Sequence, residues 1–307
     1  MAKHKKIREG RAIWVAFLAL IGLGLLVAVL LRGNDVILFN PKGLVATQQR
    51  RLMVTSTLIM LGFAVPVLIT LYFFAWKFRE TNPKATHNPS ASRGKLLMLA
   101  FWAMPTAIML ILASLMIPAT FKLEPQDTIK AEKDLLTIQV VALRWKWLFI
   151  YPGQDIATVN YVQIPVDTPV QFQLTADETP MSSFWIPHLG GQLYAMTEHN
   201  NRLNLLADTP GDYEGSAAEI NGAGFAGMRF TTRVSAQDDF DTWVAKTKQS
   251  PAELSTPEYK KLLGPSENHP ATFYKDPDPS LYSTILSKYA GSHGGSHDHQ
   301  TQGAGEH

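Results

Sequence analysis

Three long apolar runs without a single charged residue dominate the first part of the chain: Ala12–Leu31, Leu52–Trp76 and Leu96–Pro118. A helix needs roughly 20 apolar residues to cross the hydrocarbon core of a bilayer. The second and third runs meet that length, so the sequence predicts two transmembrane helices within residues 34–120, joined by a loop. Pro66 and Pro105 lie inside these runs. Membrane helices tolerate proline because neighbouring groups satisfy the freed carbonyls.

The first apolar run is open to two interpretations. It follows a basic leader that contains Lys3, Lys5, Lys6, Arg8 and Arg11. Such a leader is typical both of a cleaved signal peptide and of an uncleaved anchor. The run is longer than a usual signal core and shows no clear cleavage site, which favours an extra N-terminal helix. Residues 1–33 are therefore expected to be either a signal peptide or a further membrane helix.

The distribution of Lys and Arg predicts the orientation of these helices. The leader and the segment Lys77–Lys95 are both basic, and loops rich in Lys and Arg stay on the cytoplasmic side. The asymmetry is modest, because the segment Arg32–Arg51 is basic as well. An odd number of crossings that starts in the cytoplasm places everything after Pro118 outside, and cleavage of the first run would not change that.

The second half of the chain has the pattern of an all-β domain. From Leu135 onward, short runs rich in Val, Ile, Thr and aromatics are separated by turn residues: LLTIQVVAL, TVNYVQI, VQFQL, RLNLL and MRFTTRV. Many short strands at this spacing predict a β-sandwich or a Greek-key barrel over residues 121–234. Periodicity alone does not choose among the sandwich topologies.

Helical patterns return over residues 235–290, in the segments SAQDDFDTWVAKTK, EYKKLL and LYSTILSKY. Ser235 followed by Asp238 resembles a capping box at the start of the first helix. The last 17 residues, 291–307, are rich in glycine and histidine and are expected to be disordered. The tail histidines (His293, His297, His299 and His307) are expected to bind metal only adventitiously.

Composition excludes several classes of function. The chain contains no cysteine, which removes disulfides, thiolate metal sites, cysteine nucleophiles and a lipid-bearing cysteine together. A net charge of +2 gives no indication of nucleic-acid binding. No serine triad, phosphate loop or cluster of His and carboxylates stands out, and His188 and His199 lie in turn-rich segments without an obvious partner. We therefore expect no catalytic residues in this chain.

Two segments resemble the copper-binding parts of heme–copper oxidase subunit II: MSSFWIPHLGGQLYAM (Met181–Met196) and GSAAEINGAGFAGMRF (Gly215–Phe230). In that family a His-Ser-Phe/Trp-x-x-Pro segment and a Cys-x-x-x-Cys-x-x-x-His-x-x-Met loop hold the two-copper centre CuA. The corresponding positions here are Ser182, Ala217, Glu219, Asn221, Phe225 and Met228. Met228 alone keeps a side-chain ligand of the family, and Glu219 corresponds to the residue that contributes a backbone carbonyl.

The missing ligands decide which branch of the family the chain resembles. CuA is bridged by two thiolates, and soft thiolate donors are what favour copper at such a site. A chain without cysteine cannot supply these bridges. The resemblance is therefore to the quinol-oxidase branch, and most of all to the bo-type ubiquinol oxidases. It implies a membrane hairpin, a periplasmic cupredoxin-like Greek-key domain without CuA and a C-terminal helical arm.

The same resemblance implies the partners and the cellular context. Subunit I would hold the haems and CuB, oxidise ubiquinol and reduce O2 to water while protons are pumped. This chain would hold no cofactor and would brace and cap subunit I on its periplasmic side. Subunits III and IV and the lipids of the bacterial inner membrane would be further neighbours, and cytochrome c would not be a partner.

Two more segments carry the resemblance. WAMP (Trp102–Pro105) resembles a Trp-Thr-x-Pro motif that is often preceded, four residues earlier, by a glutamate of a proton-entry path; here that position is Met98. RWKWLFIYP (Arg144–Pro152) resembles an aromatic segment of the family, and we expect Trp145, Trp147 and Tyr151 to pack against the membrane subunit. The glycines of NGAGFAG either admit a ligand or allow a tight turn, and we expect the Phe225 ring to fill the vacated copper pocket.

Two rival hypotheses remain open at this point. The chain could be subunit II of a cytochrome c oxidase, which the missing thiolates disfavour and which metal analysis would test. It could also be a free membrane-anchored β-sandwich that serves as a binding or assembly module. Co-purification of a haem-containing partner distinguishes that module from an oxidase subunit.

Overall fold

The computed structural model describes residues 22, 36–83, 94–126, 129 and 133–289. The chain forms two compact units, Met1–Pro41 and Lys42–His307. In the first unit the described residues include a short 3-10 helix, η1 (Ile37–Phe39). Of residues 1–33, for which two interpretations were open, only Gly22 is described. The predicted tail 291–307 and residues 84–93 of the predicted loop also lie outside the described residues.

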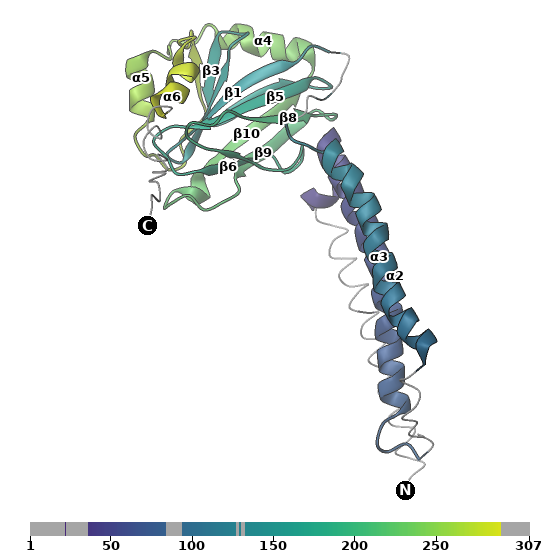
Figure 1. Cartoon of the computed structure of the whole chain (residues 1–307). Coiled ribbons are helices and arrows are strands. Elements are labelled where there is room, and N and C mark those ends of the chain that lie inside the picture. The colour runs from purple at the N-terminus through teal and green to yellow at the C-terminus, as the bar shows by residue number, and fades with distance from the viewer. Residues whose placement is uncertain (1–21, 23–35, 84–93, 127–128, 130–132, 290–307) are drawn as a thin grey trace, which may run out of the picture. The chain divides into compact units, whose positions relative to one another are not determined.

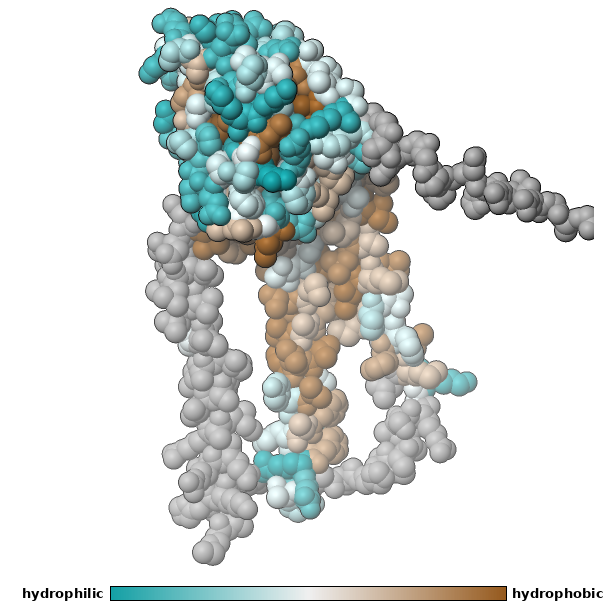
Figure 2. Space-filling view, turned by 90° about the vertical axis from the view of Figure 1, so that its left-hand side faces the viewer, coloured by the Kyte–Doolittle hydropathy of each residue, from teal (hydrophilic) through white to brown (hydrophobic). Residues whose placement is uncertain are grey.

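The second unit begins with two long helices, α2 (Leu44–Lys77) and α3 (Lys95–Lys122) (Figure 1). Each contains a stretch long and apolar enough to cross a bilayer, and those stretches are not buried against the rest of the described chain. Figure 2 shows apolar side chains gathered along them, in contrast to the hydrophilic surface of the β-domain. Both helices continue through their internal prolines, as predicted.

The start of α2 is tied to the β-domain through main-chain hydrogen bonds. The Lys42 N–H donates to the His188 carbonyl at 2.8 Å, and Gly43 forms an antiparallel bridge with Ala207. A Cβ at Gly43 would lie only 2.7 Å from the carbonyl oxygen of Leu206. The close approach of the two chain segments therefore requires glycine at this position.

Eleven strands among the described residues form two packed sheets. The order in the larger sheet is β11-β3-β2-β1-β5-β8, and in the smaller sheet it is β4-β10-β9-β6-β7. The strands are β1 (Leu136–Leu143), β2 (Lys146–Tyr151), β3 (Ile156–Val159), β4 (Tyr161–Pro165), β5 (Pro169–Ala176), β6 (Ser182–Trp185), β7 (Leu193–Ala195), β8 (Asn201–Leu206), β9 (Gly211–Ala217), β10 (Arg229–Ser235) and β11 (Thr272–Lys275). The pairs β1–β5 and β4–β10 are parallel, and the other paired strands are antiparallel. The predicted all-β sandwich is confirmed.

The core between the sheets is built from aromatic rings. Phe184 stacks on Phe230 with ring centroids 5.1 Å apart, and the Trp147 ring meets Phe184 edge-on at 5.2 Å. Trp147 and Tyr151 are completely buried inside this domain. The expectation that these two residues pack against another subunit is therefore wrong, because the sheet pleat turns both side chains into the domain's own core.

One predicted strand is in fact two. The segment TVNYVQI has the pattern of a single strand, but it breaks at Asn160, which has a left-handed φ of 52°. β3 lies in the larger sheet and β4 in the smaller one. Asn160 stabilises the corner, because its Oδ1 accepts a hydrogen bond from the Trp147 N–H at 2.9 Å and its Nδ2 donates to the His269 carbonyl at 2.8 Å.

The predicted helices of the C-terminal arm are present as α4 (Gln237–Thr247), α5 (Thr256–Leu262) and α6 (Leu281–Tyr289). The predicted capping box is wrong. Ser235 ends β10, Ala236 is the N-cap of α4, and no side chain caps the helix. The Ser235 hydroxyl instead accepts a hydrogen bond from Gln163 Nε2 at 3.0 Å.

The arm also contains strand β11, which the sequence patterns did not predict. β11 pairs antiparallel with β3 and extends the larger sheet by one strand. Apolar residues of α5 and α6 form a second core against the outer face of that sheet, with Tyr259, Leu262 and Ile285 almost fully buried. The arm thus packs on its own β-domain.

Candidate functional site

Three of the positions that correspond to copper ligands meet in one buried cluster. Asn221 Nδ2 donates to Ser182 Oγ at 2.8 Å and lies 3.0 Å from Met228 Sδ. Ser182 and Met228 are fully buried and Asn221 is 8% exposed. The Ser182 hydroxyl donates onward to the Pro180 carbonyl at 3.2 Å. An asparagine amide therefore bridges Ser182 and Met228, two of the predicted ligand positions; we refer to these three residues as the Asn221 cluster.

The smaller sheet holds this cluster in place. Ser182 begins β6, Met228 follows the 3-10 helix η3 (Phe225–Gly227), and β10 begins at the next residue. The Ala217 N–H, at the end of β9, donates to the Met228 carbonyl at 3.0 Å. The strands therefore fix the backbone of this loop without any help from a metal.

The remaining predicted positions do not join the cluster's hydrogen bonds. Ala217 presents a buried methyl group, and Phe225 is half-buried and packs at the edge of the main core. The group that bridges Ser182 and Met228 is the asparagine amide and not the Phe225 ring. The Glu219 side chain is exposed; its negative charge and its hydrogen bond raise the pKa of Tyr194.

The glycines of the loop accommodate an aromatic ring of the same chain. Trp145, in the β1–β2 turn, has a left-handed φ of 61°. A Cβ placed on Gly224 would lie 2.4 Å from the Trp145 ring, and Gly222 also lies beside that ring with a φ of 129°. Close approach of Trp145, together with one left-handed turn, explains both glycines, so no ligand is needed to account for them.

The donor set does not fit a dinuclear copper centre. The cluster offers a hydroxyl, an amide and a thioether, whereas CuA requires bridging thiolates that a chain without cysteine cannot provide. Asn221 Oδ1 is buried and has no hydrogen-bond partner among the described residues. The part of the chain that the structure describes contains no group of three or more His, Cys, Asp or Glu residues that could hold a metal ion.

A second buried polar cluster, which the sequence patterns missed, joins the arm to the end of β5. Asp177 is 2% exposed and accepts hydrogen bonds from Tyr259 Oη at 2.5 Å, from Tyr289 Oη at 2.6 Å and from Lys288 Nζ at 2.8 Å. Lys288 also contacts Glu178 at 2.8 Å. We call Asp177 with its three donors the Asp177 cluster.

The electrostatics of this cluster follow from its hydrogen bonds. Burial alone would raise the pKa of Asp177, but the bonds from Lys288, Tyr259 and Tyr289 outweigh burial and hold the pKa below its usual range. Burial and the contact with Asp177 raise the pKa of Tyr259. The carboxylate is therefore charged, and the tyrosines are neutral donors, throughout the neutral pH range.

Lys146 provides a third link between the arm and the sheet. Its side chain is 1% exposed, and Nζ donates to the carbonyls of Leu262 at 2.8 Å and Gly264 at 2.6 Å, at the C-terminal end of α5. A cation is favourable there because the last carbonyls of a helix have no partner within it. Burial lowers the pKa of Lys146. A lysine within the otherwise apolar run KWLFIY is the sequence signal that could have drawn attention to Lys146, although it does not identify the carbonyls that Lys146 binds.

The fold and the site together fit a membrane-anchored subunit of the copper-oxidase type, with no cysteine or histidine at the predicted ligand positions. Residues 248–293, which include α5, β11 and α6, match the COX Aromatic Rich Motif family. The chain is 44% identical over 273 residues to cytochrome bo(3) ubiquinol oxidase subunit 2 of Pseudomonas aeruginosa, which covers 89% of this chain and 82% of that protein. It is 40% identical over 268 residues to ubiquinol oxidase subunit 2 of Acetobacter aceti, with 87% of each chain covered.

The chain belongs to the ubiquinol oxidase subunit 2 family. The predicted fold class, a membrane hairpin followed by a cupredoxin-like β-domain and a C-terminal arm, is confirmed. Among solved structures, the periplasmic domain of subunit II of cytochrome oxidase from Bradyrhizobium japonicum is similar with a TM-score of 0.36 and 22% identity, covering 44% of this chain and 99% of that one.

Proposed function

We propose that this chain is the copper-free subunit II of a proton-pumping ubiquinol oxidase. It carries no cofactor and transfers no electrons itself. Subunit I, its main partner, holds the haems and CuB, oxidises ubiquinol and reduces O2 to water. Subunits III and IV and membrane lipids complete its surroundings, and cytochrome c is not its electron donor.

One observation carries this proposal: the donor set of the Asn221 cluster, at three of the predicted ligand positions, does not fit a dinuclear copper centre. Electron entry from cytochrome c through Trp145 would need a redox group next to the indole ring. Gly222 and Gly224 lie next to that ring instead. Electrons that arrive as ubiquinol need no such relay, which agrees with the names of the relatives reported above.

The proposed placement is the bacterial inner membrane, with α2 and α3 as spanning helices and the β-domain in the periplasm. The basic residues that precede Lys95 favour a cytoplasmic loop between the helices. In this position the β-domain caps subunit I, and the hairpin packs beside it through its exposed apolar side chains. The chain then stabilises the oxidase without entering its chemistry.

Purification of the assembled complex tests the proposal. We expect haem and this chain to co-elute in detergent chromatography, ubiquinol to be oxidised, and reduced cytochrome c to be left unoxidised. Metal analysis and electron paramagnetic resonance should detect no mixed-valence copper pair, even after copper is added to the purified chain. A dinuclear copper signal, or turnover of quinol by this chain alone, would overturn the proposal. Elution of a folded chain without any haem protein would favour a free binding module.

A further inference from the structure

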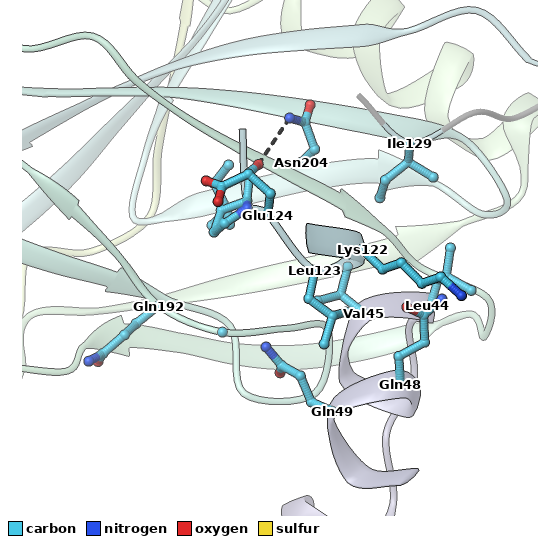
Figure 3. Close-up of a pocket in the computed structure, with 13 residues that line it drawn as sticks. Leu44, Val45, Gln48, Gln49, Lys122, Leu123, Glu124, Ile129, Gln192 and Asn204 are labelled. Atoms are coloured by element: carbon cyan, nitrogen blue, oxygen red, sulfur yellow. Dashed lines mark hydrogen bonds between the residues drawn. The ribbon is translucent and has the colours of Figure 1, made fainter. Parts of the chain in front are cut away.

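A cavity of about 220 Å³ opens between α2 and α3. Arg51, from α2, and Lys122, the last residue of α3, both line it. A second cavity, of about 340 Å³, adjoins it and shares Gln48, Lys122 and Leu123 (Figure 3). The two helices thus bring two basic side chains to one hollow.

The position of the hollow relative to the apolar runs indicates its surroundings. Arg51 directly precedes the apolar run that begins at Leu52, and Lys122 is the first charged residue after the run that ends at Pro118. Leu52, Leu115 and Ala119 form apolar walls of the same cavity. The polar headgroups of a bilayer lie just beyond its hydrocarbon core. The cavity therefore changes from basic to apolar across the depth where the phosphates of a spanned membrane would lie.

Among the described residues, neither cation has a carboxylate partner. No ion pair of Arg51 or Lys122 occurs among the residues that the structure describes. Glu124 is the acid nearest to Lys122 in the described sequence. Figure 3 shows Lys122 extending toward Leu44 and Gln48, while Glu124 lies on the other side of Leu123. The hollow is therefore suited to an anion.

We propose that this hollow binds one anionic phospholipid. The phosphodiester lies between the Arg51 guanidinium and the Lys122 ammonium, and the first acyl methylenes lie on Leu52, Leu115 and Ala119. Arginine suits this role because its planar donors match two phosphate oxygens, and lysine adds a compact second charge. Two positive charges against one phosphate leave an excess of one, which favours a glycerol headgroup over one that carries its own ammonium group. The inference rests on the proposed function only in that α2 and α3 must span the membrane.

Photo-crosslinking within the assembled oxidase tests this site. The complex is reconstituted in nanodiscs that contain phosphatidylglycerol with a photoreactive group near the phosphate, and labelled peptides are mapped by mass spectrometry. We expect labelling of peptides that contain residues 48–55 and 115–123, competed by unlabelled phosphatidylglycerol. Arg51→Gln and Lys122→Gln should each weaken labelling about fivefold, since one basic residue near an anionic lipid contributes about that factor.

Arg50→Gln is the matched control, because it removes the same charge one residue earlier on α2, from a side chain that does not line either cavity. Its labelling should equal that of the unmodified complex. Equal labelling of the Arg51→Gln/Lys122→Gln double variant, or cross-links from this hollow to a peptide of subunit I in place of lipid, would overturn the site. A phosphatidylethanolamine probe that labels as strongly would overturn the anionic preference. Haem content and quinol oxidation of the same preparations test the proposed function separately.

Discussion

Two buried polar clusters of the β-domain differ in their charge and in the elements that they connect. The Asn221 cluster is neutral, joins the start of β6 to the loop between β9 and β10, and leaves Asn221 Oδ1 without a partner among the described residues. The Asp177 cluster is charged, joins the sheet to the arm, and has three donors on one carboxylate. The first lies at three of the predicted ligand positions, and the second is a structural link.

The difference lies in how each cluster is held in place. Strands β6, β9 and β10 hold the loop of the Asn221 cluster through main-chain hydrogen bonds, so its side chains need only fill space and satisfy one another. The arm is held by the pairing of β11 with β3, by its apolar core, and by the buried side chains Asp177 and Lys146. Loss of either side chain leaves buried groups unpaired, which is costly.

The largest effect should come from Asp177→Asn. An amide cannot accept from Tyr259, Tyr289 and Lys288 as the carboxylate does, and it brings two donors of its own against them. We expect a loss of about 2–3 kcal/mol in the free energy of unfolding, as for other broken buried pairs. Limited proteolysis should cut the arm faster, within residues 248–289.

Glu178→Gln is the control for this substitution. Glu178 contacts the same Lys288, but its side chain is 45% exposed. Exposed ion pairs contribute about 0–1 kcal/mol. Equal destabilisation by the two substitutions would contradict a special role for the buried carboxylate.

Lys146→Met should have the next largest effect. The variant removes both donors to the carbonyls at the end of α5, but it also removes a charge that is costly to bury. We expect a net loss of about 1–2 kcal/mol in the free energy of unfolding. Hydrogen exchange should rise in α5 while β9 and β10 stay protected; exchange that rises equally throughout the domain would show that Lys146 does not act through the arm.

The pH dependence of the same link should be visible in acid. The pKa of folded Asp177 lies below the unfolded value of 3.8, so its contribution is complete above about pH 4 and is lost as the pH falls through the lowered pKa. The difference in stability between the unmodified chain and Asp177→Asn should therefore shrink below that pH. Denaturant midpoints measured from pH 7 to pH 2.5 check this, and a difference that stays constant would contradict the assignment.

The smallest effect should come from Asn221→Leu. The substitution removes two hydrogen bonds but also removes the unpartnered Oδ1, and an apolar side chain of similar size fills the same space. We expect a change within about 1 kcal/mol, because such polar-to-apolar exchanges are nearly neutral when the shape is kept. Ubiquinol oxidation by the complex should be unchanged. A large loss of turnover in a stable complex would mean that this loop takes part in the chemistry.

Much of the architecture was readable from the sequence because the signals were local. An uncharged apolar run longer than a bilayer crossing predicts a helix whatever its neighbours, and the altered ligand positions follow from residue identity alone. The α4, α5 and α6 helices were also recognised from their periodicity. The break at Asn160 was missed because both halves have the same alternating pattern.

The sequence by itself determined that this chain has a membrane hairpin and a sandwich, and that no thiolate is available to bridge two copper ions, since these conclusions depend only on which side chains are present. Tertiary structure alone decided that Trp147 and Tyr151 face the chain's own core, and that β11 joins the sheet. It also paired Asp177 with Lys288, 111 residues away, and Lys146 with the carbonyl of Leu262, 116 residues away. Contacts over such separations form only when the sheets close, so no local pattern of residues could have revealed them.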